Sequence, residues 1–192
     1  MKVSKFLTVG LSLSTICYLL STVLIGCGYT TRSMVSTKYK TIYIEPFVNK
    51  INITGSADSG SKYKINYPRV ESEITNSVIN RFLFDGNLKP TQKEKADLML
   101  TGEIVDFVKD PLKYNYDSQN VEEYRMNLVI NMKLKDLKAD KILWEENGFI
   151  GYTEYYTSFY TGNVTKKSDS QAIPDALTDL ARRVVERLVN EW

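Results

Sequence analysis

Tyr124-Arg125-Met126-Asn127-Leu128-Val129-Ile130-Asn131-Met132-Lys133-Leu134-Lys135 alternates apolar side chains with charged or amide side chains, and Val129 alone breaks the pattern. Successive side chains of a β-strand point to opposite faces of the sheet. The stretch therefore predicts one long strand with one face on the core. The other face, with Arg125, Lys133 and Lys135, is expected to lie in water or against a partner.

Strands are predicted on both sides of this stretch. Residues 141–152 follow a polar turn at 137–140, which favours an antiparallel hairpin. Residues 96–108 have apolar side chains at both odd and even positions, so this strand is expected to be central and covered on both faces. We expect it to end at residues 109–111, where a proline interrupts the pattern.

One more strand and two helices complete the prediction. Residues 41–47 are rich in β-branched and aromatic side chains, and a polar surface loop at 49–66 follows. A helix is expected from Pro68 to Asp85, with Gly86 as its left-handed cap. The last helix has a possible capping box at Ser168 and Gln171, although Pro174 suggests a start a few residues later. Apolar side chains recur at helical spacing in both segments: Val70, Ile74, Val78 and Phe82, then Ile173, Leu177, Leu180, Val184, Leu188 and Trp192.

The predicted fold is of the α+β class. Its elements follow the order β-α-β-β-β-α, with two helices packed on one face of a four-stranded mixed sheet. Residues 41–192 are expected to form a single domain.

The composition excludes several classes of function. The 192 residues include no histidine, which excludes a Ser-His-Asp triad and every His-ligated metal site. The adjacent carboxylates Glu122-Glu123 and Glu145-Glu146 lie in predicted strands and should point to opposite faces, so neither forms an acid/base couple. We therefore expect no enzyme, no cofactor and no metal site.

The N-terminal residues predict a lipoprotein signal peptide at 1–26. Lys2 and Lys5 precede an uncharged apolar stretch, and Leu24-Ile25-Gly26-Cys27 resembles the bacterial lipobox. That resemblance implies cleavage before Cys27, acylation of its thiol, and a lipidated tether at 27–40. An uncut transmembrane helix is the alternative, since the stretch is long enough to span a bilayer. The sorting rule of enteric-type bacteria implies the outer membrane, because residue 28 is glycine rather than aspartate.

Removal of residues 1–26 leaves 23 basic and 23 acidic residues, because the removed piece carries two of the 25 basic side chains and no acid. A neutral chain argues against nucleic acid as the main partner. The loss of Cys17 with the signal and the acylation of Cys27 would leave no cysteine for a disulfide.

Three features are candidates for binding. One is the polar strand face with Arg125, and a second is the aromatic cluster of Tyr155, Tyr156, Phe159 and Tyr160, which suits a docking surface. The third is a pair of loops that should project from the same end of the sheet. They carry Lys113, Lys166 and Lys167, whose ammonium groups would attract phosphates such as those of an anionic glycolipid.

These residues resemble the LptE family of lipopolysaccharide-assembly lipoproteins. The similar stretches are KTIYIEPFVN at 40–49, EKADLMLTG at 94–102, VEEYRM at 121–126 and ILW at 142–144, followed by a long final helix. The resemblance implies two helices on a four-stranded mixed sheet and a non-enzymatic role. It implies a lipid-anchored protein on the periplasmic side of the outer membrane that plugs the LptD barrel, helps the barrel assemble, and binds lipopolysaccharide.

The resemblance also implies that basic residues in the loops after the second and fourth strands bind lipopolysaccharide. In this chain the first loop offers Lys113, with Asn115 and Asp117 nearest the expected basic site, and the second offers Lys166 and Lys167. Two other classes stay open. One is a regulatory lipoprotein that activates a peptidoglycan synthase or a secretion channel. The other is a periplasmic hydrolase that uses lone carboxylates.

Overall fold

The structure is a computed structural model that describes residues 38–51, 63–64 and 67–190. Cys27, the predicted signal peptide, most of the predicted tether and Trp192 lie outside these residues. The described elements in chain order are β1 (Thr41–Ile44), β2 (Val48–Asn49), β3 (Tyr63–Lys64), α3 (Val70–Asp85), β4 (Lys89–Pro90), the 3-10 helix η1 (Lys93–Lys95), β5 (Leu98–Tyr114), β6 (Val121–Asp136), β7 (Lys141–Tyr156) and α4 (Asp169–Asn190).

The alternation in β6 determines which face of the sheet is buried. Its even-numbered apolar residues from Met126 to Leu134 are almost completely buried, whereas Arg125, Lys133 and Lys135 lie on the other face and stay partly or fully exposed. β6 pairs antiparallel with β5 on one side and with β7 on the other. The predicted long strand and the predicted hairpin with residues 141–152 are both confirmed.

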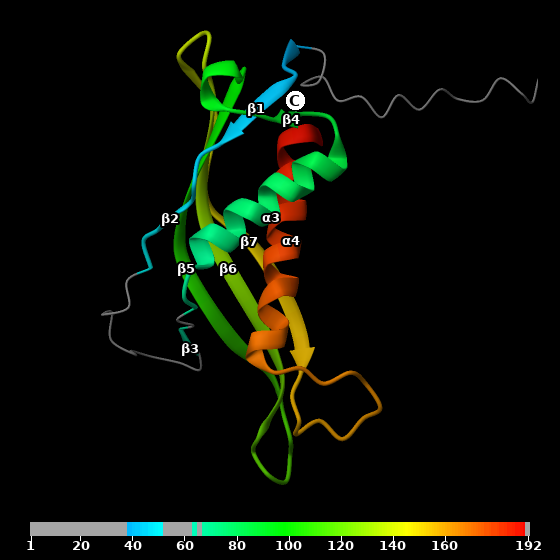
Figure 1. Cartoon of the computed structure of the whole chain (residues 1–192). Coiled ribbons are helices and arrows are strands. Elements are labelled where there is room, and N and C mark those ends of the chain that lie inside the picture. Colours follow the sequence, from blue (N-terminus) through cyan, green and yellow to red (C-terminus); the bar gives the residue numbers. More distant parts are fainter. Residues whose placement is uncertain (1–37, 52–62, 65–66, 191–192) are drawn as a thin grey trace, which may run out of the picture. The chain divides into compact units, whose positions relative to one another are not determined.

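Both helices lie on one face of the sheet (Figure 1). The described strands order as β4-β1-β5-β6-β7, with β2 and β3 paired to β5, and β1 runs parallel to β5. The predicted α+β class, the two helices and the order of the main elements are confirmed. The predicted strand number is wrong, because β2, β3 and β4 have two residues each and leave no readable pattern.

Two predictions for β5 are wrong. β5 is central, but only one of its faces is covered: Leu98, Leu100 and Ile104 are buried, whereas Met99 and Val105 are partly exposed, because both helices lie on the same side. The strand also continues to Tyr114 instead of ending near residue 110. β3 pairs with residues 108 and 109 of β5, so Pro111 lies past this contact. Among the described residues, Pro111 pairs with β6 on one side and lies at an edge on the other, and an edge position tolerates a residue without an N–H.

The helix termini follow the predicted local chemistry. Gly86 has φ 76° and its N–H donates to the carbonyl of Phe82 at 3.0 Å, so it closes α3 as expected. Before α4, the Ser168 N–H donates to Oε1 of Gln171 at 2.9 Å, which is one half of the predicted capping box. α4 begins at Asp169, so the expectation that Pro174 delays its start is wrong and Pro174 lies inside the helix.

α4 packs directly on β7 at Gly151. A Cβ at this position would lie 2.4 Å from Cβ of Leu180 and 2.5 Å from its Cα, so glycine permits the close approach. The helix also contacts the outer edge of the sheet, since Oδ2 of Asp179 accepts the backbone N–H of Tyr152 at 3.0 Å. The Arg183 guanidinium lies 4.7 Å from the centre of the Tyr152 ring. The described helices include none that is both long enough and apolar enough to cross a membrane.

Candidate functional site

The predicted basic loops lie at the same end of the sheet, below the ends of β5 and β7 (Figure 1). They are the β5–β6 loop, residues 115–120, and the β7–α4 loop, residues 157–168, and together with the last residues of β5 they form what we call the loop end. Lys113 lies in β5 and not in the loop as expected, because the strand continues to Tyr114. The chain enters β1 at the opposite end, beside the β6–β7 turn, where Tyr39 donates a hydrogen bond to Asp136 at 2.8 Å. The loop end is therefore remote from the N-terminal side of the domain.

Glu122 joins the two loops. Its backbone carbonyl accepts the N–H of Thr157 at 2.9 Å, and its carboxylate accepts the Asn115 amide at 2.9 Å. Oε2 of Glu122 lies 2.9 Å from Nζ of Lys113. The hydrogen bond from Asn115 and the one from Lys113 lower the pKa of Glu122 below its ordinary value. Glu122 is thus a nearly buried residue whose carboxylate holds Asn115 and Lys113 and whose backbone carbonyl holds Thr157 of the other loop.

Lys113 sits between its carboxylate partner and an aromatic stack. Its Nζ lies 4.8 Å from the centre of the Tyr160 ring, and Tyr160 stacks on Tyr156 with ring centres 4.4 Å apart. The hydrogen bond to Glu122 raises the pKa of Lys113, so this side chain stays charged. Tyr156 and Tyr160, two of the residues predicted to dock a partner, therefore pack beside Lys113, a residue predicted to bind phosphate.

Tyr155 does not belong to an exposed docking surface, because it is 3% exposed. Its hydroxyl donates to Asp169, which also pairs with Nζ of Lys109 at 2.6 Å, and its ring stacks on Tyr124. Burial, and then the hydrogen bond to Asp169, raise the pKa of Tyr155 far above its ordinary value. The alternation along β7 explains the burial, since Tyr155 and Tyr156 point to opposite faces.

Lys166 and Lys167 differ in their surroundings. Lys167 pairs with Asp175 of α4, and its backbone N–H donates to the carbonyl of Tyr156 at 2.8 Å. Lys166 is exposed, and within the described ranges it has no ion-pair partner. Both lysines border an open depression of about 680 Å³ at the start of α4. Lys166 is the cation of this loop that an external anion reaches most directly.

Exposed apolar side chains accompany these lysines. Phe159 is 53% exposed and Tyr116 is 92% exposed, and Tyr114 and Val164 are also exposed. Tyr114 and Tyr116 stand out in the sequence only as aromatic residues in a polar loop. Their location at the same end of the sheet as Phe159 depends on the pairing of β6 with both β5 and β7 and could not be predicted from local pattern.

Arg125 does not join the loop lysines. It lies on the helix-free face of the sheet, where its Nε donates to Oε1 of Glu154 at 2.9 Å. Its guanidinium also lies 5.2 Å from the centre of the Tyr152 ring. The structure thus brings Lys113 together with the β7–α4 loop and leaves Arg125 on the sheet face.

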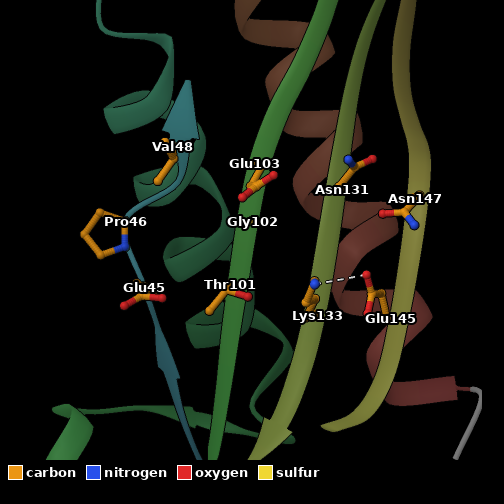
Figure 2. A pocket seen from close by; sticks show the side chains of 10 residues that line it. All are labelled: Glu45, Pro46, Val48, Thr101, Gly102, Glu103, Asn131, Lys133, Glu145 and Asn147. Carbon is orange, nitrogen blue, oxygen red and sulfur yellow. Dashed lines mark ion pairs between the residues drawn. The ribbon is translucent and has the colours of Figure 1, made fainter. Parts of the chain in front are cut away.

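The helix-free face carries a shallow hollow of about 300 Å³, shown in Figure 2. Lys133 lies 3.1 Å from Glu145 there, and Glu103 lies 2.5 Å from Lys50. Glu146 points to the other face and pairs with Arg187 at 2.7 Å, so the adjacent carboxylates separate as the sequence predicts. Among the described residues, no group of three or more Cys, Asp or Glu side chains could hold a metal ion.

The comparison with family models decides the family. Residues 39–188 match the LptE model, whose description is lipopolysaccharide-assembly. The chain belongs to the LptE family. The description of this family names the assembly of a glycolipid. The match begins at Tyr39 and ends at Leu188, so it includes β1, α3, all of α4 except its last two residues, and both loops of the loop end.

Other comparisons add little to the LptE match. No curated protein matches the sequence. Among solved structures, a minor lipoprotein from Acinetobacter baumannii has 13% identity and a TM-score of 0.46, over 78% of this chain and 90% of that chain. A PelC dodecamer from Paraburkholderia phytofirmans has 11% identity and a TM-score of 0.43, over 80% of this chain and 90% of that chain.

Proposed function

We propose that this LptE-family chain is a lipoprotein of the outer membrane, anchored through Cys27 on the periplasmic side, that plugs an LptD-type barrel and binds lipopolysaccharide at its loop end. The observation that carries the proposal is the arrangement of the two ends. Lys113 near the end of β5 and the lysine-bearing β7–α4 loop lie at one end of the sheet, and the chain enters β1 at the other. The family membership supplies the class of ligand.

The length of the sheet supports a plug. β5 has 17 residues, and at about 3.3 Å per residue it spans roughly 50 Å. A body of this length can stay anchored at one end while its other end reaches far into a barrel. The paired loops, fixed by Glu122, give the inserted end a defined shape.

The loop end suits an amphiphile that carries phosphate groups. The Lys166 ammonium is exposed, and Lys113 is charged and held in place. Phe159 and Tyr116 offer apolar surface beside these cations. Phosphate and acyl groups occur together in lipopolysaccharide, so both kinds of contact are available to one ligand.

Co-purification tests the barrel partner. The full chain is extracted from bacterial membranes in mild detergent, and the proteins that remain bound to it are identified. We expect a stoichiometric LptD-type barrel. A monomer without a barrel would contradict the plug, and capture of a peptidoglycan synthase or a secretion channel would favour the regulatory alternative.

A charge reversal tests the loop end. Lys166→Glu with Lys167→Glu should weaken binding of purified lipopolysaccharide, and Lys166→Glu alone should produce most of the loss because Lys167 is paired with Asp175. Lys141→Glu is the matched control, since Lys141 is an exposed lysine at the other end of the sheet. Equal binding by all three variants would remove the lysines of this loop from the site.

A further inference from the structure

The last turn of α3 exposes two large apolar side chains in succession. Leu83 is 59% exposed and Phe84 is 82% exposed, although Phe82 beside them is completely buried. Phe84 is covered on one side by Arg81, whose guanidinium lies 5.3 Å from its ring centre. A protruding Leu-Phe pair on a helix end contributes nothing to the core described above.

This turn lies beside the place where the chain enters the domain. α3 ends at Gly86, and Lys89 of β4 follows at once. The Lys89 N–H donates to the carbonyl of Lys40 at 2.9 Å, and Lys89 pairs in register with Thr41 at the start of β1 (Figure 1). The apolar pair and the first described residues therefore belong to the same end of the molecule.

Positive charge predominates around the pair. The exposed lysines of the segments at this end are Lys38, Lys40, Lys89, Lys93, Lys95, Lys138 and Lys141. Glu94 and Asp140 are exposed acids of the same segments, whereas Asp97 accepts hydrogen bonds from Thr41 and Lys138, and Asp136 accepts one from Tyr39. Exposed apolar side chains within a cluster of lysines are typical of surfaces that bind anionic lipid.

The chain length outside the structure sets how far this end can lie from a bilayer. Eleven peptide units separate Cys27 from Lys38, which corresponds to at most about 40 Å. An acylated Cys27 would thus hold the lysines and the Leu-Phe pair within reach of the headgroups. The attraction of lysine to anionic headgroups acts over about a Debye length, ~8 Å at physiological salt, and a tether of this length allows the domain to enter that range.

We propose that Leu83, Phe84, Lys38, Lys40 and Lys89 form a membrane-contact surface that rests on anionic phospholipid, with Phe84 and Leu83 at the boundary of headgroups and acyl chains. The inference rests on the proposed anchor at Cys27. It adds a second contact that fixes how the domain stands on the bilayer. With the N-terminal end against the lipid, the loop end points away from the headgroups at the site of contact.

The two exposed phenylalanines allow a matched test. Phe84→Trp places a fluorophore in the membrane-contact surface, and Phe159→Trp places one at the loop end, where exposure is also high. The full chain is produced with its own N-terminal segment and reconstituted into vesicles of phosphatidylethanolamine and brominated phosphatidylglycerol. Quenching is measured relative to the unsubstituted chain, because Trp144 and Trp192 contribute a background.

We expect strong quenching of Phe84→Trp by the brominated lipid and none of Phe159→Trp. Vesicle flotation, measured on the same samples, separates the anchor from the surface. Flotation without quenching at position 84 overturns the membrane-contact surface and leaves the anchor intact. A chain that does not float overturns the proposed anchor and the surface together, and equal quenching at both positions overturns the proposed orientation.

A charge variant tests the role of lysine. Lys89→Glu in the Phe84→Trp background should shift the equilibrium away from the lipid-bound orientation by about fivefold or more at low salt, and Lys89→Arg should not. Added salt should weaken the quenching of the parent more than that of Lys89→Glu, which keeps Lys38 and Lys40. If quenching is unchanged in Lys89→Glu, the assignment of anionic lipid is overturned. It is also overturned if a bound protein shields the fluorophore of Phe84→Trp from the brominated lipid.

Discussion

Nζ of Lys113 lies 2.9 Å from Oε2 of Glu122, and the same ammonium lies 4.8 Å from the centre of the Tyr160 ring in the β7–α4 loop. Lys113 precedes the β5–β6 loop, whereas the carbonyl of Glu122 receives the N–H of Thr157 from the β7–α4 loop. A ligand phosphate at Lys113 would therefore compete with a carboxylate that already holds it in position.

Glu122→Gln should loosen both loops. The variant loses the charged partner of Lys113, which lies against the Tyr160 ring, and weakens the acceptor of Asn115, so amide hydrogen exchange should become faster at residues 115–120 and around Tyr160. The Thr157 N–H should stay protected, because its acceptor is the backbone carbonyl of residue 122. Asp117→Asn, an exposed change in the same loop, is the control and should leave exchange unchanged. Faster exchange confined to the first loop would show that Glu122 does not couple the two.

Asp97→Asn should lower stability at neutral pH. Oδ2 of Asp97 accepts the N–H groups of Lys40 and Thr41 at 3.0 and 3.1 Å, and Oδ1 accepts Nζ of Lys138 at 2.6 Å. An amide cannot accept at both positions, so we expect a loss of roughly 1–3 kcal/mol in the free energy of unfolding, measured by urea denaturation.

The same variant should change the dependence of stability on pH. The hydrogen bond from Lys138, together with those from Lys40 and Thr41, holds the pKa of Asp97 well below its ordinary value. A carboxyl with a lowered folded-state pKa stabilises above its unfolded-state pKa, and this contribution is lost as pH falls through the folded-state value. The difference between parent and Asp97→Asn should thus be constant near neutrality and shrink in acid. Asp140→Asn, which removes only an exposed ion pair with Lys135, is the control and should have a stability close to that of the parent.

Tyr155→Phe should destabilise the domain without changing its shape. The substitution removes the hydroxyl that donates to Asp169 and keeps the stacked ring, so the expected cost is about 1–2 kcal/mol in thermal or urea unfolding. Phe159→Leu, at an exposed position of the adjacent loop, should have little effect. A variant as stable as the parent would mean that water replaces the hydroxyl at Asp169.

Gly151→Ala should separate α4 from the sheet. The new methyl group would lie 2.4 Å from Cβ of Leu180 and 2.5 Å from its Cα, and a helix backbone cannot move aside as a side chain can. Overpacking of this kind costs roughly 1–3 kcal/mol, which a lowered urea midpoint would reveal. Asn147→Ala, on the same strand and exposed, is the control, and equal midpoints would contradict the close contact.

The sequence predicts the elements of this fold better than their limits. The residues from Met126 to Leu134 predict β6, because a strand with one buried face must alternate apolar and polar side chains. The length of β5 could not be predicted, because the effect of Pro111 depends on which neighbours the strand has at that point. The burial of one face of β5 depends on the placement of both helices, which local periodicity does not specify.

The candidate site shows the same division. The shared location of Lys113 and the Lys166 loop follows from the order of strands, so it could be predicted. The burial of Tyr155 and the role of Glu122 could not, since both depend on partners far along the chain, Asp169 and Thr157. Cys27 lies outside the described residues, and its acylation stays a prediction from the N-terminal pattern.

Asp179 occupies the Tyr152 N–H on the outermost strand, and Arg183 lies over the ring of the same residue. A second polypeptide could not pair with β7 at this point, because the Tyr152 N–H already donates to Asp179 and the Arg183 side chain lies beside it. In the proposed plug, this arrangement would keep the sheet of this protein separate from the strands of the surrounding barrel.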